Sequence, residues 1–313
     1  MMPETGQLDV VTGAFSYSGA AIARELRAAG RQVRTVTGHP ERAPAGTDIE
    51  VRPLNFADQA ELTRSLRGAH TLYNTYWVRF PHGRVDFQTA VANSRVLFGA
   101  AAAAGVQRIV HVSITNPSLS SPYPYFRGKA EAEQSLDETG VPHAIARPAV
   151  LFGGDGVLVN NIAWLLRHVP VFAVGGRGDY RLRCIHVDDL ARLCTALGAR
   201  SDTVVVDAVG PERLTFRELV DAIRAAVGSR ALVLPVPAPV VLAVSRGLNA
   251  VLRDTLLTRD EYLAMADGLA DSPAPSAGQI VLTNWIAEHG PELGRGYANE
   301  LDRHFRPART ASA

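Results

Sequence analysis

Short apolar runs alternate with helical hydrophobic patterns over the first two thirds of the sequence. After the first run, Ala20, Ile22, Ala23 and Leu26 recur at the spacing of one helix face. Strands that alternate with helices in this way favour an α/β fold, so we expect a doubly wound parallel sheet of the Rossmann type. The expected strands cover residues 10–12, 33–37, 49–54, 70–76 and 108–113.

A glycine-bounded turn, Gly13-x-x-Ser16-x-x-Gly19, joins the first expected strand to the first expected helix. Gly13 permits the backbone of a tight turn, and Gly19 lets the helix approach the strand closely. Free N–H groups at a helix start attract anions, so the pyrophosphate of a dinucleotide is the expected ligand. Ser16 replaces the usual middle glycine, and its small hydroxyl can still bond a phosphate. Phe15 and Tyr17 lie in the same turn and are counted with the cofactor contacts.

The end of the second expected strand predicts the choice of cofactor. An NAD-preferring site usually has an acidic residue there, bound to the ribose 2′-OH. The strand ends instead at Thr37, followed by Gly-His-Pro-Glu-Arg. His39 and Arg42 carry groups suited to a 2′-phosphate, which favours NADP(H) over NAD(H), although both residues also fit a solvated loop.

Side chains after the third and fourth expected strands are further cofactor candidates. Asn55 can bond the adenine edge while Phe56 covers the ring, but Asn55 equally fits the cap of a helix over residues 58–66. Asn74 and Thr75 stand at the carboxyl edge of the sheet, where open α/β sheets bind ligands. Two aromatic residues follow and fit either a wall of that crevice or plain packing, namely Tyr76 and Trp77.

Three residues add chemistry to the predicted binding site: Ser113, Tyr125 and Lys129. Pro124 suits the first turn of a helix, which places Tyr125 and Lys129 at i and i+4 on one face. A nearby ammonium lowers the pKa of a tyrosine, so Tyr125 is the candidate proton donor or acceptor, and Lys129 can also hold the ribose. Ser113 would bind the substrate oxygen, with Thr115 as its competitor. The structural alternative is a partly buried tyrosine beside a surface lysine, with Ser113 satisfied by backbone.

Six segments follow one another in a characteristic order: residues 12–19, Asn93, and residues 109–113, 125–129, 147–153 and 186–191. This order resembles that of the short-chain dehydrogenases/reductases of the extended or atypical type. Within that superfamily, residues 125–130 and 160–164 resemble the branch similar to the nucleotide-binding accessory subunit of respiratory complex I. That branch is taken to bind NADPH structurally.

The resemblance implies a role for each matching position. Gly13, Ser16 and Gly19 would hold the pyrophosphate, and Asn55 with Phe56 the adenine. Tyr125 and Lys129 would hold the ribose and nicotinamide. The segment from Pro148 to Leu151, which includes Val150, would contact the nicotinamide carboxamide.

Beyond Gly153 the alternation of strands and helices loosens, which predicts a smaller C-terminal α+β lobe. We expect a dinucleotide-binding domain over residues 1–155, with residues 184–210 returning to it, and a substrate-binding lobe over 156–183 and 211–305. Residues 306–313 would be a frayed tail. Arg181 or Arg183 could reach an anionic substrate, although a surface arginine is the simpler interpretation. His186 has no partner at metal-ligand spacing, so no metal site is expected.

Composition narrows the class of protein. The formal net charge of +1 gives no electrostatic argument for nucleic acid binding. Two cysteines cannot form a disulfide framework, residues 1–6 lack the features of a signal peptide, and no apolar run approaches a membrane span. We therefore expect a cytoplasmic protein.

Three functions fit these observations. The first is hydride transfer between NADP(H) and a carbonyl or alcohol substrate. The second is a non-catalytic NADPH-binding protein with a structural or redox-sensing role. The third is a nucleotide-sugar epimerase or dehydratase, against which count the missing acid after Thr37 and the short spacing of 12 positions between Ser113 and Tyr125.

Overall fold

The computed structural model describes residues 6–81, 83 and 85–301, and the chain divides into two compact units. The first unit is formed by residues 1–148 and 187–208, and the second by residues 149–186 and 209–313. The tail expected to be frayed, 306–313, lies outside the described residues.

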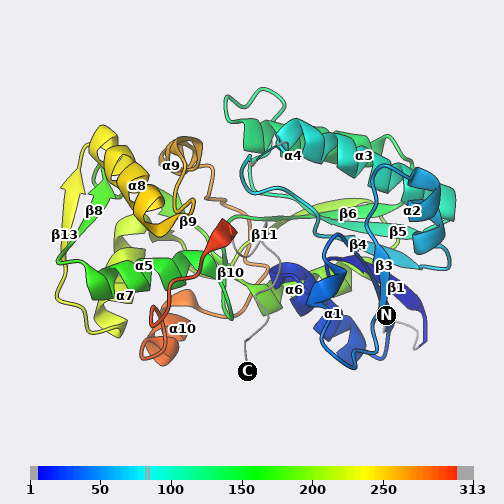
Figure 1. Ribbon diagram of the computed structural model, residues 1–313, viewed down its shortest axis with the longest axis horizontal. Helices are drawn as coiled ribbons and strands as arrows, with labels where there is room; N and C mark the ends of the chain where they lie inside the picture. Colours follow the sequence, from blue (N-terminus) through cyan, green and yellow to red (C-terminus); the bar gives the residue numbers. More distant parts are fainter. Residues whose placement is uncertain (1–5, 82, 84, 302–313) are drawn as a thin grey trace. The chain divides into compact units, whose positions relative to one another are not determined.

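A seven-stranded parallel sheet forms the centre of the first unit (Figure 1). Its strand order is β11-β6-β5-β4-β1-β2-β3, and every neighbouring pair is parallel. The winding direction reverses between β1 and β4, so their carboxyl ends flank the point where such sheets bind ligands. The strands are β1 (Leu8–Thr12), β2 (Gln32–Thr37), β3 (Glu50–Pro53), β4 (Thr71–Asn74), β5 (Arg108–Val112), β6 (His143–Pro148) and β11 (Val204–Ala208).

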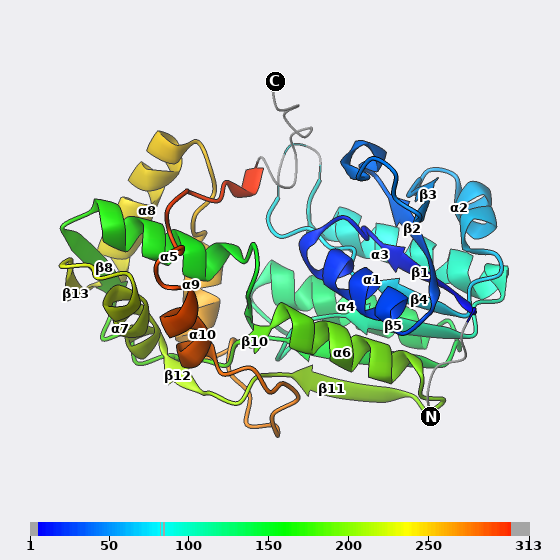
Figure 2. The ribbon, with the colours of Figure 1, turned by 90° about the horizontal axis from the view of Figure 1, so that it is seen from below.

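Helices cover both faces of this sheet, which confirms the predicted doubly wound Rossmann-type fold. One face carries α2 (Gln59–Leu66), α3 (Phe87–Ala104) and α4 (Pro124–Asp137) (Figure 1). The other carries α1 (Tyr17–Ala28) and α6 (Val187–Gly198), which lie side by side in Figure 2. A short 3-10 helix, η1 (Pro40–Arg42), follows β2.

The core under α2 and α3 is built from the inward faces of strands and helices. Val10, Leu72 and Ile109 of three neighbouring strands are fully buried against Leu97 and Phe98 of α3. Small alanines continue the buried face of α3 at its C-terminal end and let the helix lie close to the sheet.

The second unit combines helices with three small two-stranded sheets. Its sheets pair β7 (Leu151–Phe152) with β10 (Ile185–His186), β8 (Val171–Gly175) with β13 (Leu232–Val236), and β9 (Arg181–Leu182) with β12 (Leu214–Thr215). Thr215 and Glu218 form a capping box. The helices are α5 (Val157–His168), α7 (Phe216–Ala226), α8 (Ala238–Leu252), α9 (Arg259–Ala266) and α10 (Leu282–His289).

Candidate functional site

The glycine turn between β1 and α1 is shaped by two close approaches. Gly13 adopts a φ of +61°, and its N–H donates to the carbonyl of Val36 at 2.9 Å. A Cβ added to Gly19 would stand 2.1 Å from the carbonyl oxygen of Gly13, closer than any real contact. Only glycine therefore allows α1 to start so close to the strand end.

Ser16 occupies the N-cap of α1, but its hydroxyl turns back into the turn. It donates to the carbonyl of Gly13 at 2.7 Å and makes no capping bond to the helix. Ser16 is exposed, and Phe15 and Tyr17 beside it are half-buried. The first turn of α1 has no acidic side chain, which suits the approach of an anion. Pyrophosphate contact by these residues stays a prediction.

Side chains at the ends of β1 and β4 lock the two strands together. The Thr12 hydroxyl accepts from the N–H of Thr75 at 2.6 Å, and the Thr75 hydroxyl donates to the Thr12 carbonyl at 2.7 Å. Asn74 is fully buried, with its amide 3.0 Å from Nδ1 of His111 and its oxygen accepting from the N–H of Tyr76. The observed bonds of Asn74 and Thr75 thus shape the strand ends, and a direct cofactor contact by either stays a prediction.

The segment after β2 brings a carboxylate beside the predicted phosphate contacts. Nδ1 of His39 lies 3.0 Å from a carboxylate oxygen of Glu41, and backbone hydrogen bonding is the main cause that lowers the pKa of Glu41. Arg42 ends η1 and is half-buried. The role of His39 and Arg42 toward a 2′-phosphate stays a prediction.

Asn55 and Phe56 lie between β3 and α2. The Asn55 amide donates to Glu61 at 2.9 Å, and its oxygen accepts from the N–H of Ala57. Asp58, not Asn55, caps α2 by accepting from the N–H of Glu61 at 2.8 Å, so the alternative capping role of Asn55 is wrong. Phe56 packs against the ring of Tyr76 with centroids 4.7 Å apart. Their adenine contacts stay predictions.

Lys129 lies on α4 with its side chain almost wholly buried, at 3% exposure. Its Nζ donates to the carbonyl of Val112 at 3.0 Å and stands 4.4 Å from the centre of the Trp77 ring. Burial lowers the pKa of Lys129 to about 7, against an opposing effect of Glu133 one turn further along the helix. The surface position considered from sequence is therefore wrong.

The sequence carries a signal for this residue beyond its spacing from Tyr125. Lys129 is the only lysine in the chain, and every other residue in the combined Lys and Arg count of 32 is an arginine. Arginine stays charged at any ordinary pH, whereas a buried lysine readily becomes neutral. The position of the single lysine is therefore a feature that the sequence alone can single out.

Tyr125 and Ser113 are the other two residues singled out for chemistry. Tyr125, half-buried in the first turn of α4, meets the rings of Trp77 and Phe87 edge-on, with centroids 6.0 and 5.6 Å apart. Ser113 directly follows Val112, the residue that accepts from Lys129. The Ser113 N–H is bonded to the Ala146 carbonyl, but its buried hydroxyl has no hydrogen-bond partner among the described residues. Ser113 is thus next in sequence to the residue that binds Lys129, and Tyr125 lies one helical turn before Lys129 on α4; a joint role of the three residues stays a prediction.

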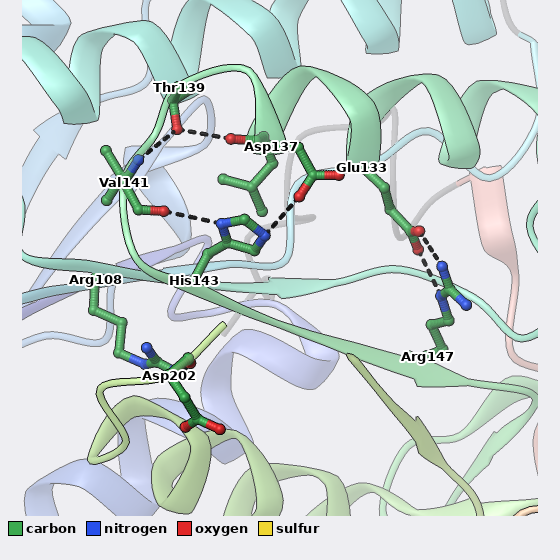
Figure 3. A network of polar contacts seen from close by, with 9 residues as sticks. Arg108, Glu133, Asp137, Thr139, Val141, His143, Arg147 and Asp202 are labelled. Carbon is green, nitrogen blue, oxygen red and sulfur yellow. Dashed lines mark hydrogen bonds and ion pairs between the residues drawn. The ribbon is translucent and has the colours of Figure 1, made fainter. Parts of the chain in front are cut away.

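Polar contacts fasten α4 to β6 (Figure 3). Arg147 holds the carboxylate of Glu133 with two hydrogen bonds, from Nε at 3.0 Å and from a terminal nitrogen. Further along, Nε2 of the buried His143 lies 2.9 Å from a carboxylate oxygen of Asp137. Two residues of β6 thus hold the C-terminal half of α4, and Arg147 fixes the turn that carries Glu133.

The remaining sequence candidates fall in both units. Pro148 ends β6 in the first unit, where its carbonyl accepts from the N–H of the fully buried Thr115. Val150 belongs to the second unit, and its carbonyl accepts from the N–H of Ile185. Arg183 is buried and donates to backbone carbonyls of its own unit, including that of Gly210 at 3.0 Å, so it serves the fold rather than an outside anion.

Comparison with known proteins relates part of this chain to a described family. Residues 13–162 match a family model described as NAD(P)H-binding. The chain thus carries an NAD(P)-binding domain, which confirms the resemblance drawn from its motifs. No helix within the described residues combines the length and apolar character needed to cross a bilayer.

Individual relatives are distant. The chain is 29% identical over 215 residues to (4-alkanoyl-5-oxo-2,5-dihydrofuran-3-yl)methyl phosphate reductase of Streptomyces griseus, covering 67% of this chain and 70% of that protein. It is 23% identical to subunit 9 of the NADH dehydrogenase (ubiquinone) 1 alpha subcomplex of Arabidopsis thaliana, covering 69% of this chain and 57% of the plant subunit. An Escherichia coli NADPH-dependent quinone oxidoreductase, solved with NADPH, superposes with a TM-score of 0.74 at 19% identity, covering 90% of this chain and 99% of that one.

Proposed function

We propose that this protein is an NADP(H)-dependent oxidoreductase of the short-chain dehydrogenase/reductase type. It would transfer a hydride between NADP(H) and a small carbonyl or alcohol substrate, in a cytoplasm that keeps its two buried cysteines reduced. The observation that carries the proposal is Lys129, the only lysine, which is buried one helical turn from Tyr125 and bonded to the carbonyl of Val112, the residue before Ser113.

The residues of the site fit the steps of carbonyl reduction. When bound, NADPH supplies the hydride. Tyr125 gives its hydroxyl proton to the carbonyl oxygen, and the ammonium of Lys129 stabilises the tyrosinate that remains. The unpaired hydroxyl of Ser113 donates to the same oxygen, and Tyr125 recovers a proton from solvent. Lys129 must be protonated for this role, so reduction slows as pH rises above about 7.

The first test removes the Tyr125 hydroxyl. Tyr125→Phe keeps the aromatic packing and should lower the kcat of carbonyl reduction by about 10²-fold or more, with a much smaller effect on the Kd for NADPH. Tyr123→Phe removes a hydroxyl just before the same helix and is the matched control. A variant Tyr125→Phe as active as the wild type would overturn the catalytic role.

Preference for NADP(H) is part of the proposal, supported by the basic groups after β2 and by the NADPH-dependent structural neighbour. A paired titration by nicotinamide fluorescence should give a lower Kd for NADPH than for NADH. The double variant His39→Ala, Arg42→Ala should weaken NADPH by about tenfold and leave NADH nearly unchanged, because only NADPH carries the 2′-phosphate. Arg52→Ala, which removes an exposed arginine of β3, is the control. Tighter binding of NADH would sink the NADP(H) assignment.

A second candidate is a non-catalytic NADPH-binding protein. The similarity to a respiratory complex I subunit favours it, as does the aromatic packing that encloses Tyr125. It predicts tight NADPH binding with no turnover of any carbonyl compound and no effect of Tyr125→Phe. Epimerase chemistry, the third candidate, would be marked by NAD that stays bound through purification and by affinity for a nucleotide sugar.

A further inference from the structure

Trp77 lies in the loop after β4 and covers the ammonium of Lys129. The 4.4 Å distance from Nζ to the ring centre is within the range of a cation–π interaction. Gly128, next to Lys129 on α4, allows the close fit, because a Cβ there would already press on the indole at 3.3 Å. Trp77 is thus fitted to the helix at the point where Lys129 leaves it.

Other groups near this ammonium differ in whether they favour the charged form of Lys129. Glu133 of α4 favours the charged form. His111 of β5 has a pKa held well below its usual range by burial and, second, by the charge of Lys129, so it faces the amine in its neutral form. The Val112 carbonyl accepts one ammonium hydrogen, and Tyr125 touches the same indole. The face of the indole adds a further favourable contact for the positive charge.

We propose that Trp77 is a positioning residue that holds the protonated side chain of Lys129 against the Val112 carbonyl, beside Tyr125. This proposal depends on the proposed function only where it predicts an effect on catalysis. The contact between the indole and the amine is a property of the folded chain with or without turnover.

Position 129 carries a lysine, and a buried lysine needs a stabilising contact if it is to keep its charge. An arginine would stay charged without help, but the amine loses its proton readily when it is buried. The indole face returns part of the charge stabilisation that burial removes, without adding a second ion. Loss of the ring should therefore lower the pKa of Lys129 by about one unit.

Because the chain holds one lysine, the experiment needs no resonance assignment. Protein produced with [ε-¹³C]lysine gives one side-chain signal, whose chemical shift against pH reports Lys129 alone. Trp77→Leu should lower the titration midpoint by about one unit and Trp77→Phe by less, since a benzene ring is the weaker partner for a cation. Phe87→Leu removes another aromatic contact of Tyr125 and should leave the midpoint in place.

The outcomes separate this proposal from the catalytic one. An unchanged midpoint in folded Trp77→Leu, or in Trp77→Phe if the leucine variant does not fold, overturns the positioning role even if the enzyme is active. A lowered midpoint supports it even if no carbonyl compound is turned over. In an active enzyme, the alkaline fall of kcat should move with the midpoint while the Kd for NADPH does not.

Discussion

Arg147 of β6 binds the carboxylate of Glu133 on α4 through two hydrogen bonds, and Glu133 stands one helical turn beyond Lys129. The pair is mostly buried, with 9% of the Glu133 side chain and 28% of the Arg147 side chain exposed. A strand thus fixes the carboxylate that supports the charge of the buried amine. The position of this charge is set by the fold, not by a flexible surface pair.

The variant Glu133→Gln should shift the pH dependence of Lys129 toward acid. Loss of the carboxylate removes the interaction that favours the ammonium, so the pKa of Lys129 falls below its value of about 7. Reduction requires the protonated form, and its alkaline decline should move to lower pH by about half a unit to one unit. A kcat profile between pH 5 and 9 measures this shift.

Glu138→Gln is the matched control, since Glu138 is an exposed carboxylate at the end of the same helix. Its profile should coincide with that of the wild type. A Glu133→Gln profile that also coincides with the wild type would remove Glu133 from the electrostatics of Lys129.

A methyl group at Gly19 should disrupt the turn between β1 and α1. The added Cβ would stand 2.1 Å from the Gly13 carbonyl oxygen, so the helix must move away from the strand. We expect Gly19→Ala to destabilise the first unit by about 1–3 kcal/mol and to abolish NADPH binding. Gly38→Ala is the control, because a Cβ there meets nothing within 4 Å. Thermal melting and nicotinamide fluorescence compare the two, and equal behaviour would contradict the packing argument.

Asn161 should hold the segment after α10 in the second unit. Its amide donates to the Ala298 carbonyl at 2.9 Å and its oxygen accepts from the Ala298 N–H at 3.0 Å, with the side chain buried. Asn161→Ala leaves both backbone groups without partners, at a cost of about 1–3 kcal/mol. Limited proteolysis should then cut near Ala298 faster than in the wild type. Unchanged cleavage would show that other contacts hold the segment.

Much of the fold follows from the sequence, and the failures have physical causes. The period of apolar residues predicts the strands of the sheet, but the fourth strand ends at Asn74 rather than at Tyr76. The side-chain oxygen of Asn74 accepts the N–H of Tyr76 and so takes a backbone group that a longer strand would use. A local pattern cannot reveal this bond, because an asparagine that ends a strand and one that binds a ligand look alike.

For the candidate site too, one part follows from the sequence and another part does not. Sequence spacing places Tyr125 and Lys129 on one helix face and Ser113 at a strand end, and the structure puts the Lys129 amine on the carbonyl of Val112, the residue before Ser113. The partners that tune them come from elsewhere: Trp77 from the loop after β4 and Arg147 from β6. Contacts between distant segments depend on the tertiary fold. The uniqueness of Lys129, by contrast, is visible in the sequence alone.

Removal of the Lys129 amine should stabilise the fold while it abolishes reduction. The pKa of Lys129 falls from 10.5 to about 7 on folding because of burial, so the unfolded chain binds more protons between these two values. Stability contributed by this group therefore rises with pH across that window, and the full penalty is present below pH 7. Lys129→Met keeps an apolar stem against Trp77 and should raise the melting temperature at pH 6 by about 3 °C or more.

The gain should shrink as pH rises toward 10, and Lys129→Arg, which keeps a buried charge at every pH, should show no such gain. Melting curves of the three proteins at pH 6, 8 and 10 give the comparison. Equal melting temperatures for wild type and Lys129→Met at pH 6 would mean that the fold accommodates the ammonium without cost, and that the lysine is charged well above pH 7.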